Sequence, residues 1–151
     1  MLWSKLIREQ NQFNSTDEIT QFVSEFEACT WARERWTHEA HLTVGLWYLV
    51  RHEEREATAR IRAGIKRYNQ ACGIAQTETS GYHETITLFY VRVISRYLAR
   101  APQDATLAEL VRGLLATCGD RQLPFVYYSR ERLFSSSART SWVEPDLCAL
   151  D

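Results

Sequence analysis

Apolar side chains recur at intervals of three and four residues along almost the whole chain of 151 residues. This spacing places them on one face of an α-helix, whereas a half-buried strand alternates at every second residue. No alternating stretch exceeds four residues, and the three prolines and three of the six glycines fall between the periodic segments. The pattern predicts an all-α fold: a single-domain bundle of five or six helices, mostly up-and-down, over residues 1–151.

Residues that commonly begin and end helices divide this pattern into six segments. Ser15 with Glu18 and Thr106 with Glu109 have the spacing of a capping box. The expected helices cover about 16–29, 37–52, 54–72, 82–100, 106–118 and, less clearly defined, 127–139. A continuous helix through the second and third segments would be longer than a compact domain of this size is wide, which favours a reversal near residues 52–53.

Composition and charge exclude several classes of protein. Acidic and basic residues nearly balance at a formal net charge of -1, so no broad field attracts nucleic acid or an anionic membrane. The longest apolar run, Val44–Val50, is too short to cross a bilayer. The first ten residues lack a signal core, and the four cysteines show no paired spacing. We therefore expect a cytoplasmic protein with no nucleic-acid or membrane partner.

Three histidines are the best candidate functional groups. A helical wheel places His38 and His41 on the apolar face of the second predicted helix, and His83 on that of the fourth. Sequential helices with short connections are antiparallel, so these two helices run in the same direction and their histidines share one level. Three neutral imidazoles, two of them at i and i+3, predict a site for a divalent transition metal such as Zn, Fe or Ni, with one position open to water or substrate.

Other roles for these histidines are open. They could serve metal-free catalysis or ligand binding, or be hydrogen-bonded groups in the core. Mixed ligation is also open, because Cys29, Cys72 and Cys118 each end an odd-numbered helix and so fall at the histidine end. Their spacings match no zinc motif, and a buried thiol is commonly a small apolar group.

Further candidates come from charged and aromatic residues. Glu27, near the end of the first helix, is a candidate fourth ligand or general base. Arg130 and Arg139, in the arginine-rich segment after Tyr127, are candidates for orienting an anionic substrate. The alternative for these arginines is a solvated face paired with acidic residues. Four aromatic residues near the inward faces could form either pocket walls or ordinary core: Trp36, Tyr68, Tyr82 and Tyr90.

Three short segments carry a resemblance to known proteins. WTHEAHL at 36–42, GYHET at 81–85 and YYSR at 127–130 resemble those of an uncharacterised bacterial family of hypothetical proteins. That resemblance implies no activity. More loosely, the architecture resembles the DinB/YfiT-like helical bundles, which are of similar length. This second resemblance implies a metal held by three histidines inside a helical bundle.

Two hypotheses of function follow. The first is a metal-dependent enzyme with a small, anionic substrate, in which His38, His41 and His83 bind the ion; the reaction is hydrolysis, group transfer or oxidation. The second is a non-catalytic helical module that binds a small molecule or a protein, with structural histidines. A homodimer is a further expectation, since three tryptophans could cover a shared surface: Trp3, Trp31 and Trp142.

Overall fold

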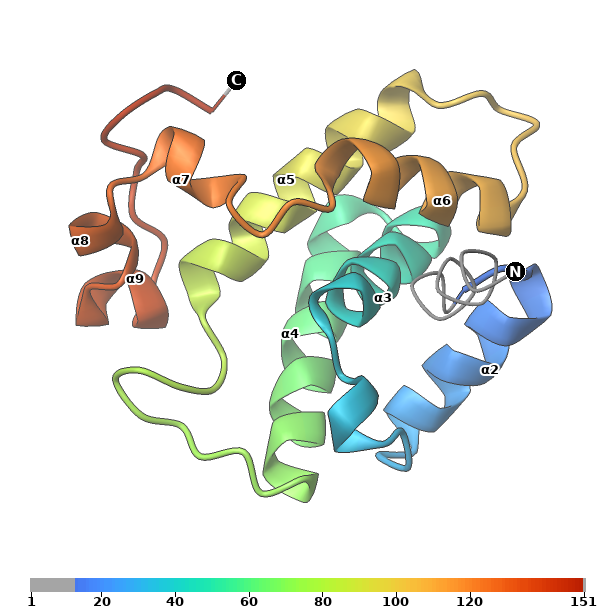
Figure 1. The fold of residues 1–151 in the computed structure, drawn as a ribbon, viewed down its shortest axis with the longest axis horizontal. Helices are drawn as coiled ribbons and strands as arrows, with labels where there is room; N and C mark the ends of the chain where they lie inside the picture. Colours follow the sequence, from blue (N-terminus) through green and yellow to red (C-terminus); the bar gives the residue numbers. More distant parts are fainter. Residues whose placement is uncertain (1–12, 151) are drawn as a thin grey trace, which may run out of the picture.

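The computed structural model describes residues 13–150, and all the regular structure in them is helical (Figure 1). This confirms the predicted all-α fold. Five long helices form the body of the molecule: α2 (Thr16–Glu27), α3 (His38–Arg51), α4 (Glu54–Ala71), α5 (Glu84–Arg100) and α6 (Leu107–Cys118). Within the described residues, no helix combines the length and the apolar character that a membrane crossing needs.

Local capping explains where these helices begin. The Ser15 hydroxyl accepts a hydrogen bond from the Glu18 amide (3.1 Å) at the start of α2. Thr106 and Glu109 form the complete reciprocal capping box predicted for α6, with distances of 3.2 and 3.1 Å. The predicted reversal between the second and third segments is confirmed, because α3 ends at Arg51 and α4 begins at Glu54.

Helix α3 is the centre of the bundle. It contacts each of the other four long helices, α2, α4, α5 and α6. Residues on all its sides are buried, including Leu42, Thr43, Val44 and Leu46, as expected for a helix surrounded by others. Gly45 permits the approach to α5, since a Cβ at this position would lie 2.9 Å from Ile94 Cδ1. The middle of α3 is therefore enclosed by its neighbours.

The C-terminal region differs from the single helix predicted over 127–139. It forms three short helices, α7 (Pro124–Tyr127), α8 (Arg130–Leu133) and α9 (Ser136–Thr140). The reason is local: the hydroxyls of Ser129 and Ser135 each accept a backbone N–H at 3.2 Å and start a new helix. In Figure 1 these helices gather beside the beginning of α5, and α9 contacts α5 directly.

A short 3-10 helix, η1 (Arg33–Arg35), was not predicted and connects α2 to α3. The Trp31 indole N–H donates to the Arg35 carbonyl (3.0 Å), and the Trp31 side chain is only 5% exposed. Trp31 therefore belongs to the core and does not provide the dimer surface considered above. Trp142 packs beneath the Arg92 guanidinium, 4.4 Å from its ring, and Trp3 lies outside the described residues. Trp31 thus gives no support to the prediction of a homodimer.

Candidate functional site

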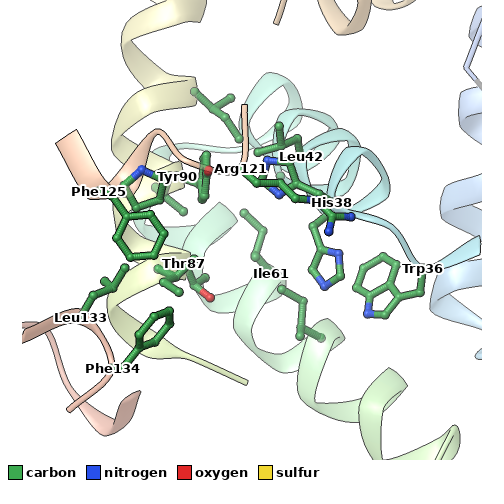
Figure 2. A pocket seen from close by; sticks show the side chains of 17 residues that line it. Trp36, His38, Leu42, Ile61, Thr87, Tyr90, Arg121, Phe125, Leu133 and Phe134 are labelled. Atoms are coloured by element: carbon green, nitrogen blue, oxygen red, sulfur yellow. The ribbon is translucent and has the colours of Figure 1, made fainter. Parts of the chain in front are cut away.

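A cavity of about 470 Å³ lies beside the first turn of α3. Residues of α3, α4 and α5 form its walls, together with Arg121, Pro124, Phe125 and residues 133–134 of the C-terminal region. Figure 2 shows Phe125, Leu133 and Phe134 on one side of this pocket and Trp36 and His38 on the other. Most lining side chains are apolar, for example Leu42 and Ile61. Its volume is within the range of small-molecule sites.

His41 stands at this cavity as a neutral base. Its Nδ1 lies 2.7 Å from the Thr37 carbonyl and must carry the proton that is donated there, which leaves Nε2 as the acceptor nitrogen. The ring packs against Trp36 with 3.7 Å between the centroids. Burial, with the nearby His38 and Arg121, lowers the pKa of His41 to about 4. The imidazole is therefore uncharged at neutral pH.

His38 and Tyr90, which line the cavity, each carry an unsatisfied polar atom. Their rings meet edge to face at 5.3 Å. His38 Nε2 and Tyr90 Oη are buried without a hydrogen-bond partner among the described residues. Burial lowers the pKa of His38 and raises that of Tyr90, so both groups are neutral at pH 7. Unsatisfied buried polar atoms are rare in native proteins, and two in one cavity indicate a missing partner.

Arg121 supplies the positive charge of the site. It is exposed, lines the cavity, and is close enough to both His38 and His41 to lower the pKa of each. It belongs to neither of the two ion pairs of the described residues. No acidic side chain stands among the lining residues of the described chain. Glu39 and Asp120, which are not part of the lining, raise the pKa of His38, so it is the charge within the lining itself, that of Arg121, that favours an anionic group.

His83 occupies a different position from the one predicted. It is the N-cap of α5 rather than a member of its first turn: Nδ1 accepts from the Ile86 amide (3.1 Å). Its Nε2 donates to the Leu133 carbonyl at 2.7 Å, so both ring nitrogens are occupied. Burial lowers the pKa of His83. Its place in the structure is to hold α8 against the beginning of α5.

The three predicted metal ligands are thus not assembled into one site. His38 and His41 share the main cavity, whereas His83 lines a neighbouring one of about 330 Å³, which His41 also borders. Across residues 13–150, no group of three or more His, Cys, Asp or Glu side chains is placed to hold a metal ion. The three-histidine ligand set does not fit this geometry, because an imidazole with both nitrogens hydrogen-bonded has no lone pair to give.

The other predicted residues also lie away from the main cavity. Glu27 is exposed and accepts a hydrogen bond from the Tyr48 hydroxyl at 2.6 Å. The Arg130 guanidinium lies over the Phe125 ring, 4.9 Å from its centroid. Arg139 donates to the carbonyls of Glu78 and Gly81, at 3.0 and 3.1 Å, and so holds the loop before α5. None of these three candidates lines the main cavity, so catalytic roles for them there are not supported.

The structure divides the predicted aromatic residues between cavity walls and core, and it places the cysteines outside the main cavity. Trp36 and Tyr90 line the main cavity, whereas Tyr82 lines the smaller neighbouring one. Tyr68 is fully buried and donates to the Trp31 carbonyl, which places it in the core. The four cysteines are free thiols, and none of them lines the main cavity: Cys29, Cys72, Cys118 and Cys148.

Arg121 was missed by reasoning from sequence, although a signal for it existed. It follows the end of the fifth predicted helix, and the antiparallel order that placed Cys118 at the histidine end applies equally to a residue three positions later.

Comparison with known proteins adds nothing to this geometry: no family model, no curated protein and no solved structure matches the chain.

Proposed function

We propose that this protein binds a small molecule with an apolar body and one anionic, hydrogen-bonding group in the main cavity. The observation that carries this proposal is the pair of buried, unpartnered atoms, His38 Nε2 and Tyr90 Oη, in a largely apolar cavity of about 470 Å³. Leaving a buried polar group unsatisfied costs about 1–3 kcal/mol. A ligand that supplies the missing partners recovers this energy on binding, which gives the empty protein a built-in affinity for it.

The walls divide the ligand into two parts. The aliphatic and aromatic side chains receive the apolar body, since burying apolar surface contributes roughly 25 cal/mol per Å². The polar part belongs near His38, Tyr90 and Arg121, because these groups offer donors and one positive charge. The neutral imidazoles donate or accept without adding charge, so Arg121 selects the sign.

The metal-dependent enzyme is an alternative for the same cavity. His38 and His41 are neutral at pH 7, which is the form of imidazole that binds a metal ion. A metal would have to be held without His83, however, and with ligands that the described residues do not bring together. Metal content of protein purified without a histidine tag separates the two proposals: stoichiometric metal that is lost in His38→Ala favours the enzyme.

Three related probes test the ligand-binding proposal. Naphthoate, naphthylmethanol and naphthylmethylamine share an apolar body and differ in charge, so calorimetric titration with each measures the selection of sign. We expect naphthoate to bind most tightly and Arg121→Gln to weaken it about tenfold, the loss of one charge-assisted contact. Arg112→Gln is the matched control, because Arg112 is exposed on α6 and lines none of the cavities described here. Equal affinity for the three probes would reject an anionic ligand.

A cavity-filling variant tests the location. Ile61 lines the cavity and is 3% exposed, so Ile61→Phe adds a ring into the space that the apolar body needs. We expect folded protein that no longer binds naphthoate. Unchanged binding in folded Ile61→Phe would place the ligand elsewhere and contradict the proposal.

A further inference from the structure

A second cavity, of about 460 Å³, lies on another side of α5. It is formed by the second half of α5, the residues that follow it, the end of α6 and the segment leading into α7. None of its lining residues lines the main cavity. Two arginines from consecutive turns of α5, Arg96 and Arg100, are the charged residues of its lining.

These arginines have no counter-ion in the described structure. The two ion pairs of residues 13–150 involve Arg60 and Arg62, and no acidic side chain stands in the lining of this cavity. Arg96 Nη2 is buried without any hydrogen-bond partner. A buried, charged donor without an acceptor is among the costliest unsatisfied groups in a protein. The cavity is therefore short of acceptor oxygens.

The hydroxyl groups of the lining do not accept a hydrogen bond from Arg96 Nη2. The Tyr97 hydroxyl donates to the Leu110 carbonyl at 2.8 Å, and the Thr117 hydroxyl donates to the Gly113 carbonyl at 2.8 Å. Both act within the helices that form the wall, and neither contacts Arg96 by a hydrogen bond. The two guanidinium groups are thus the donors left for a ligand.

The geometry of the pair suits an oxyanion. Residues at i and i+4 of a helix are neighbours on its surface, so the two guanidinium groups can approach one carboxylate or phosphate together. The rest of the lining is largely apolar and includes Val93, Leu123 and the Tyr127 ring. We propose that this second cavity binds a small molecule that carries a carboxylate or phosphate group on a compact apolar body.

The test is calorimetric titration of the whole protein with each of four compounds: phenyl phosphate, benzoate, inorganic phosphate and benzyl alcohol. We expect phenyl phosphate or benzoate to bind saturably, with benzyl alcohol much weaker; the stronger of the two anions identifies the ligand chemistry. Arg96→Gln should weaken that anion at least about tenfold, whereas Arg112→Gln, with the same loss of charge on an exposed helix face, should leave it within about twofold.

Two further variants keep the test decisive. Arg96→Lys retains the charge but not the fork and should bind with intermediate affinity, and Arg100→Gln removes the more exposed partner if Arg96→Gln does not fold. Arg121→Gln should leave phenyl phosphate binding unchanged, since Arg121 lines the other cavity. Equal affinity for benzyl alcohol and phenyl phosphate, equal loss in Arg96→Gln and Arg112→Gln, or no saturable binding of any of the anions would overturn the proposal.

Discussion

Replacing Tyr90 with phenylalanine should stabilise the unliganded protein. The substitution keeps the ring that packs against Phe89 (5.1 Å between centroids) and His38, and it removes only a hydroxyl. Tyr90 is 9% exposed and its Oη has no partner, so no hydrogen bond is broken. Removing the unsatisfied hydroxyl recovers its desolvation cost of about 1–3 kcal/mol. The small void that the oxygen leaves cancels part of this gain. We expect a gain of about 1 kcal/mol, which raises the melting temperature by about 2–4 °C in a domain of this size.

Tyr97→Phe is the matched control for this measurement. Tyr97 lies on the same helix, but its hydroxyl donates to the Leu110 carbonyl at 2.8 Å. Its removal should destabilise the protein by about 1 kcal/mol, so the two variants should move the urea midpoint in opposite directions. Naphthoate binding should weaken in Tyr90→Phe alone. If Tyr90→Phe destabilises the protein as much as Tyr97→Phe does, the Tyr90 hydroxyl is already satisfied, and the main support for the proposed function is lost.

Three other predictions concern stability. In urea denaturation, His83→Ala should destabilise the protein by about 2 kcal/mol, because it removes the cap of α5 and the hydrogen bond to Leu133. His83→Asn should recover part of this loss, because asparagine can cap the helix again. Burial lowers the pKa of His41 to about 4 from an unfolded value of 6.5, so the unfolded chain binds more protons between these values. Unfolding free energy should therefore fall by up to about 3 kcal/mol as pH drops from about 6.5 towards 4, and a flat profile would contradict the buried imidazole. Arg139→Ala should release the loop before α5, with about 1–2 kcal/mol lost and faster limited proteolysis at residues 77–81; unchanged cleavage would show that the loop is held by other contacts.

Features that depend on neighbouring residues in sequence could be predicted. The cap of α2 at Ser15 and the capping box of Thr106 with Glu109 follow from contacts within one helical turn, whereas the reversal at residues 52–53 follows from the width of a compact domain. The three C-terminal helices were missed, although their caps are also local contacts. The single helix predicted over 127–139 runs through Ser129 and Ser135, although a serine is equally suited to cap a new helix.

The position of His83 shows how one local choice changes a functional prediction. Thr79 and Ser80 resemble a helix start, and this placed His83 within the helix that followed. In the structure, the Ser80 hydroxyl donates to the Ala75 carbonyl and the Thr77 hydroxyl accepts two loop amides, so these side chains stabilise a turn. The cap of α5 then falls to the His83 ring, whose nitrogens are no longer available to a metal.

The remaining parts of the site depend on contacts between distant segments. His38 and Tyr90 are separated by fifty-two positions, and whether their polar atoms find partners depends on how α3 and α5 cross. The periodicity placed both residues on inward faces, which the structure confirms. It contained no information on the missing hydrogen bonds, since every possible partner lies elsewhere in the chain.

The central position of α3 links the fold to the sign of the expected ligand. His38, the first residue of α3, lines the cavity, and the amide dipoles of a helix make its N-terminal end positive. Arg121 adds a formal positive charge at the same place, while burial keeps His38 and His41 neutral. A protonated imidazole there would be opposed by both the dipole and Arg121, whereas an anionic ligand would be stabilised by both. The charge of Arg121 and the dipole of α3 thus predict a preference for naphthoate over naphthylmethylamine, and a preference for the amine would contradict this assignment of sign.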